Sequence, residues 1–134
     1  PSLHIAIVVL AYTFFRQTFK ELEMDNKEQD FYNAELYRGA LDIAETVLYV
    51  KQHSVNCIPA ALFMMTNLIP EYFKAEDAKI FINDLFKDCT DIQPEDKINI
   101  HNHIKNMYEN LLQEKGDKDW TEPVKNWIVN YIPS

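Results

Sequence analysis

The chain has 134 residues, 47% of them hydrophobic, which is enough for one domain to bury a core without disulfides or metal. Acidic residues outnumber basic ones by 21 to 13, giving a formal net charge of −8. This balance argues against binding to nucleic acid or to anionic membrane surfaces, which both require clustered lysine and arginine. The 2 glycines are too few for β-hairpin turns or for phosphate-binding loops. We therefore expect an all-α protein without a nucleotide-binding loop.

The run from Leu3 to Phe15 is the most apolar stretch of the chain. It is shorter than the roughly 20 residues that a membrane-spanning helix needs. Its β-branched residues are also compatible with a strand, but no turn signal separates it from the helical pattern that continues to Met24. Apolar residues fall on opposite faces of this helix, which is typical of a helix buried on both sides. We expect it at the centre of a compact bundle of about six helices.

Capping residues and apolar periodicity indicate where the later helices begin and end. Pro59 and Pro94 suit the first turn of a helix, where the missing N–H has no intrahelical partner. Pro70 and Gly116 are typical of positions that follow a helix. The patterns predict five further helices, over residues 27–53, 59–69, 75–89, 94–115 and 121–131.

No long linker or internal repeat divides the sequence, so we expect residues 1–134 to form a single all-helical domain. The chain begins with Pro1 and not with Met, which leaves open that it is a fragment of a longer protein. Cys57 and Cys89 are too few for a disulfide framework, and we expect both to be reduced thiols in a cytoplasmic protein.

Catalytic and metal-binding patterns are weak in this sequence. His101 and His103 lie on opposite sides of a predicted helix, so they are poorly placed to bind one metal ion together. A wider set of ligands, His53, Cys57 and His101, is the basis of an alternative interpretation as a metal-dependent hydrolase. Our first expectation is a protein with no catalytic residue, no cofactor and no metal, which metal analysis of the purified protein tests.

The predicted helix over residues 75–89 carries a candidate docking surface. Asp77, Asp84 and Asp88 follow one flank of it, and Ile80 lies beyond them, away from the apolar stripe that faces the core. An exposed isoleucine beside carboxylates suits a basic, partly apolar segment of a partner. Solvated surface charge is the alternative interpretation.

The predicted helix over residues 94–115 has a row of amides opposite its apolar face. The row consists of Asn99, Asn102, Asn106 and Asn110. Asparagine forms helices less well than the Glu, Lys or Gln common at exposed positions, so a partner that hydrogen-bonds to the amides is one explanation. A genome that encodes asparagine frequently is the other.

The sequence thus favours a non-catalytic protein–protein interaction module. Its small, acidic, all-helical composition is similar to that of secretion chaperones, adaptor subunits and toxin-immunity proteins. We expect an adaptor or chaperone-like subunit of a larger complex, binding a basic or amphipathic segment of a protein, with no nucleic acid bound and no direct membrane insertion. A third interpretation is a domain that docks in a membrane-associated assembly through its first helix.

Overall fold

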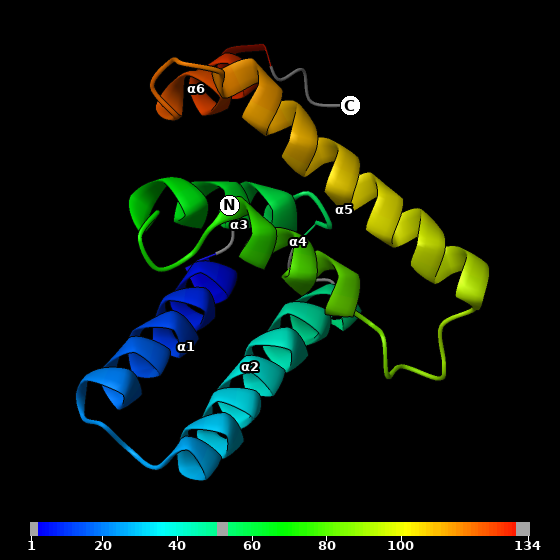
Figure 1. Ribbon diagram of the computed structural model, residues 1–134. Coiled ribbons are helices and arrows are strands. Elements are labelled where there is room, and N and C mark those ends of the chain that lie inside the picture. The colour runs from blue at the N-terminus through cyan, green and yellow to red at the C-terminus, as the bar shows by residue number, and fades with distance from the viewer. Residues whose placement is uncertain (1–2, 51–53, 131–134) are drawn as a thin grey trace.

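The computed structural model describes residues 3–50 and 54–130, which form six helices and contain no strand. The helices are α1 (Leu3–Glu21), α2 (Asn26–Tyr49), α3 (Cys57–Leu68), α4 (Ala75–Asp84), α5 (Pro94–Lys115) and α6 (Thr121–Asn130). In Figure 1, α1 and α2 form an antiparallel pair, α3 and α4 cross the middle of the molecule, and α5 leads to α6 at the far end. The predicted all-α bundle is confirmed.

Local signals set most helix boundaries. The α5 helix has the predicted bounds, with Pro94 in its first turn and Gly116 at its C-cap with a φ of 47°. The α2 helix ends at Tyr49, and the last part of its predicted range, residues 51–53, lies outside the described residues. The end of the last predicted helix, residue 131, lies outside them as well.

The α4 helix is shorter than its apolar pattern predicts. It ends at Asp84, and Phe86 follows in the left-handed region with a φ of 60°. The Phe86 backbone N–H donates a hydrogen bond to the carboxylate of Glu45 on α2, at 2.8 Å. This contact between distant parts of the chain stabilises the turn that follows α4. It holds Phe86 in the left-handed conformation, which bulky residues rarely adopt.

The most enclosed helix is α3, not α1. Ile58, Ala61, Leu62 and Phe63 of α3 have no exposed surface, and α3 packs against α1, α4 and α5. The α1 helix buries one face, including Ile5, against α2 and α3. Its opposite face is exposed, so the expectation that α1 is buried on both sides was wrong. Both of its faces are apolar, and the bundle covers only one.

A row of aromatic rings joins α1, α2 and α4 in the core. Tyr12 packs edge-on against Phe73 and Tyr37, with ring centroids 6.3 Å and 5.4 Å away. The Tyr37 ring packs in turn on Phe81, and its hydroxyl donates to the Asp84 carboxylate at 2.7 Å. Burial raises the pKa of Tyr12 and Tyr37, and for Tyr37 the bond to Asp84 raises it further.

These raised pKa values predict a loss of stability in alkali. The tyrosines stay neutral in the folded chain but ionise at a pH of about 10 once unfolded, so their contribution to stability is complete below that pH and lost above it. We expect the urea midpoint to fall as the pH rises past about 10, and to fall less in Tyr37→Phe. Urea titrations at a series of pH values, with tyrosinate absorbance recorded in parallel, test this. An equal fall in both proteins would contradict the assignment to Tyr37.

Candidate functional site

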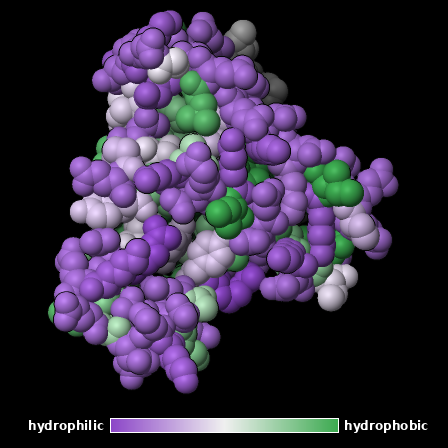
Figure 2. Space-filling model, in the orientation of Figure 1, coloured by the Kyte–Doolittle hydropathy of each residue, from purple (hydrophilic) through white to green (hydrophobic). Residues whose placement is uncertain are grey.

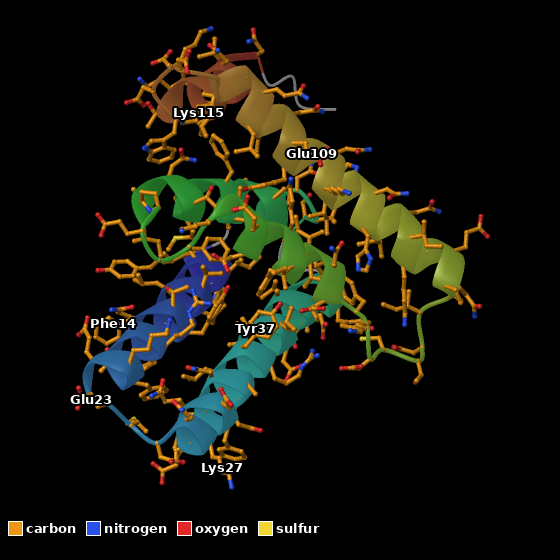
Figure 3. All side chains as sticks on the ribbon, viewed as in Figure 1. Phe14, Glu23, Lys27, Tyr37, Glu109 and Lys115 are labelled. Atoms are coloured by element: carbon orange, nitrogen blue, oxygen red, sulfur yellow. The ribbon has the colours of Figure 1, made fainter. Side chains whose placement is uncertain are left out.

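The exposed face of α1 is an apolar stripe, one of the two apolar faces that we expected to be buried. It consists of Leu3, Ile7, Leu10 and Phe14, whose exposed fractions are 68%, 53%, 47% and 61%. Spacings of four, three and four residues keep these side chains on one side of the helix. In Figure 3, Phe14 lies on the side of α1 that faces away from α2. We call these four residues the α1 stripe.

The part of α1 that carries the stripe has no charged residue, and Glu21 at the end of α1 lines the hollow beside Leu10 and Phe14. No Asp, Glu, Lys or Arg occurs in α1 before Arg16. Beside Leu10 and Phe14 the surface is hollowed by about 200 Å³, and Ile69 and Tyr72 from the segment after α3 form the opposite wall. Spacing alone could have identified the stripe, but residues on the other face of α1 are equally apolar, so the sequence does not show which face is covered.

The acidic flank predicted on α4 is present, but its carboxylates already have partners within the chain. Asp77 accepts a hydrogen bond from the Lys74 backbone N–H at 2.8 Å, and Asp84 accepts one from Tyr37. Asp88, beyond the end of α4, accepts one from Arg38 at 3.2 Å. These contacts stabilise the start and end of α4 and leave fewer carboxylate lone pairs for another protein.

Ile80 is 55% exposed, which agrees with its predicted position away from the core. Together with Asp77 it borders a hollow of about 320 Å³ between α1, α2 and α4, whose other walls include Tyr12, Arg16 and Tyr37. The fold therefore brings Asp77 and Ile80 to one hollow, whereas Asp88 is held by Arg38 and is not part of its lining.

Glu45 is a buried carboxylate on α2. Only 6% of the residue is exposed, although glutamate is rarely buried. Its carboxylate accepts the Phe86 N–H and pairs with Arg38 at 3.0 Å. Arg38 also pairs with Asp42 at 2.7 Å and with Asp88. The network joins α2 to the chain reversal after α4, which indicates a structural role for Glu45.

The amide row lies on the solvent side of α5, as predicted. Asn99, Asn102, Asn106 and Asn110 are all exposed, and within the described residues their side-chain amides form no hydrogen bond. The four amides therefore remain available to a partner. The row itself contains no apolar side chain that would add hydrophobic contact.

Of the residues of the alternative metal site, Cys57 and His101 lie in the described part of the chain. His53 lies outside the described residues. His101 donates from Nε2 to the Leu85 carbonyl oxygen at 2.5 Å, whereas His103 lies 2.6 Å from the Asn56 side-chain oxygen, so the two histidines contact different elements. Among residues 3–50 and 54–130, no group of three or more His, Cys, Asp or Glu side chains is arranged to hold a metal ion.

Comparison with known protein families, curated proteins and solved structures finds no match for this chain. In the described part of the chain, none of the helices combines the length and the apolar character needed to cross a bilayer. Figure 2 shows a largely hydrophilic face interrupted by separate hydrophobic patches. The class that the fold and surface define is thus an acidic helical bundle with local apolar surfaces.

Proposed function

We propose that this protein is a non-catalytic interaction module that binds an amphipathic helix of another protein on the α1 stripe. The observation that carries the proposal is the exposure of four aligned large apolar side chains on a helix segment that has no Asp, Glu, Lys or Arg. Contiguous apolar surface of this kind is typical of interaction sites, whereas single exposed apolar residues are ordinary. A module of this kind fits an adaptor or chaperone-like subunit of a larger complex.

The geometry of the stripe suits a partner helix. Leu3, Ile7, Leu10 and Phe14 have the alternating spacing of a seam between two packed helices. The hollow beside Leu10 and Phe14 offers a place for one large apolar side chain of the partner. Because no charged residue lies between Leu3 and Phe14, we expect the hydrophobic effect to supply most of the binding free energy.

The acidic flank and the amide row are the second candidate for the partner surface. The chain's net charge of −8 favours a basic segment, and Ile80 supplies an exposed apolar contact. This surface is the weaker candidate of the two, because Asp77, Asp84 and Asp88 already accept hydrogen bonds from other residues of the chain. The two free thiols, Cys57 and Cys89, support a reducing compartment such as the cytoplasm.

The double variant Ile7→Asp/Leu10→Asp tests the proposal. Both side chains are about half exposed, so we expect the fold to persist while partner capture from an extract of the producing cells falls at least tenfold. The matched control is Ile98→Asp/Val129→Asp, which adds the same charge at two exposed apolar positions elsewhere. Circular dichroism and quantitative pull-down give the two readouts.

Salt dependence separates the two candidate surfaces. A partner held on the α1 stripe remains bound as the salt concentration rises, whereas a basic partner on the acidic flank is released. Equal capture by the wild-type chain, the stripe variant and the control would contradict the proposal. Self-association that the stripe variant abolishes would identify a second copy of the chain as the occupant, and would contradict the assignment to another protein.

A further inference from the structure

A second apolar hollow lies between α3, α5 and α6, at the end of the molecule away from the tip of the α1–α2 pair (Figure 1). Its volume is about 390 Å³. Most of its wall consists of aliphatic and thioether side chains, chiefly Ala60, Met64, Met107, Leu111, Val124 and Ile128. We call this hollow the α6 groove. It is separate from the α1 stripe and shares no residue with it.

The polar side chains that line the α6 groove are uncharged: Ser54 and Asn56 lie beside the start of α3, and Trp120, which carries an indole N–H, lies between α5 and α6. Ser54 accepts a hydrogen bond from the Asn56 backbone N–H at 3.2 Å, and the Asn56 side-chain oxygen lies 2.6 Å from His103 Nε2. No Asp, Glu, Lys or Arg side chain contributes to the lining. The lining is therefore mostly apolar, with a few neutral groups that donate and accept hydrogen bonds.

We propose that the α6 groove binds an uncharged amphiphile with a single alkyl chain and one neutral polar head. Small-molecule sites are concave, mostly apolar, and contain a few polar groups that orient the ligand. At about 390 Å³ the groove falls within the range of small-molecule sites, roughly 300–1,000 Å³, which is enough for an alkyl chain. The apolar part receives the chain, and the head lies near Ser54 and Asn56.

The charge distribution selects a neutral head over an ionised one. A carboxylate placed in the groove would lose hydration without gaining a cationic partner from the lining. The net charge of −8 adds a long-range repulsion against anions. Met64 and Met107 are flexible and polarizable, so the wall adapts to chains of somewhat different shape.

The two cysteines provide a direct measurement in the wild-type chain. Cys57 lines the α6 groove and Cys89 lies outside it, while both are free and partly exposed. Decanol is the probe, and the rate of maleimide labelling is followed separately at each thiol by mass spectrometry. We expect saturating decanol to slow labelling of Cys57 about tenfold and to leave Cys89 unchanged. Decanoate at the same concentration should leave the labelling rate of Cys57 nearly unchanged.

Two neighbouring positions on α6 give a matched pair of variants. Ile128 lines the groove and is 61% exposed, whereas Val129 is 80% exposed and lies outside it. We expect Ile128→Asp to weaken decanol binding about tenfold and Val129→Asp to leave it unchanged, because only the first places a charge beside the chain. Isothermal titration of both variants measures this, with circular dichroism confirming that both are folded.

Four outcomes would overturn the proposal. Equal slowing of both thiols would indicate nonspecific, detergent-like binding, and equal protection by decanoate would refute the neutral head. Equal decanol affinity of the Ile128→Asp and Val129→Asp variants would place the ligand elsewhere. A Cys57 that reacts far more slowly than Cys89 without any probe would show that a chain segment or a second copy covers the groove. Each outcome is independent of partner binding on the α1 stripe.

Discussion

Replacing Glu45 with alanine should lower the free energy of unfolding by about 3 kcal/mol, as expected for removal of a buried, hydrogen-bonded carboxylate. The substitution leaves the Phe86 N–H without its acceptor in a buried position and removes one partner of Arg38. It also weakens the contact that holds Phe86 in the left-handed region. Urea denaturation monitored by circular dichroism measures the effect.

Asp42 offers the control for this prediction. It pairs with the same Arg38, but its side chain is 60% exposed, and exposed pairs contribute about 0 to 1 kcal/mol. Asp42→Ala should therefore change the urea midpoint little. Glu45→Gln should have an intermediate effect, because an amide oxygen still accepts the Phe86 N–H but lacks the charge that pairs with Arg38. A loss in Asp42→Ala as large as that in Glu45→Ala would locate the stabilising contribution in the ion pairs and not in the Phe86 contact.

Aspartate at two positions of α4 should give opposite results. Ile82 is 1% exposed, so Ile82→Asp places a carboxylate in the core without a partner and should cost about 4 kcal/mol or unfold the protein. Ile80 is 55% exposed, and Ile80→Asp should change stability by less than about 0.5 kcal/mol. Thermal melts compare the two variants, which carry the same added charge on the same helix.

The same pair also tests the second docking candidate. We expect Ile80→Asp to weaken partner capture only where the partner reaches the α4 flank, and to leave capture by the α1 stripe intact. Full loss of partner capture in a folded Ile80→Asp variant would indicate that the partner binds at the hollow bordered by Asp77 and Ile80, and not on the α1 stripe. A large loss of stability in Ile80→Asp would contradict its exposed position.

Helix content and several boundaries could be predicted because they depend on neighbouring residues. Pro94 and Gly116 mark the ends of α5, and the scarcity of glycine disfavours strands and turns. The exposed position of Ile80 also followed from its place on a helical wheel, since α4 has one clearly apolar face. Binding residues could be proposed but not ranked, because the sequence does not show which carboxylates have partners.

By itself the sequence determined an all-helical, acidic protein with most of its helix boundaries, since capping, helix propensity and periodicity act within a few residues. Only the tertiary structure decided that Glu45 is buried, that α4 ends before Phe86, and which face of α1 remains exposed. The contact between Glu45 and Phe86 joins residues 41 positions apart, which no local pattern encodes. An α1 helix with two apolar faces has no preferred inner side until its neighbours α2 and α3 cover one of them.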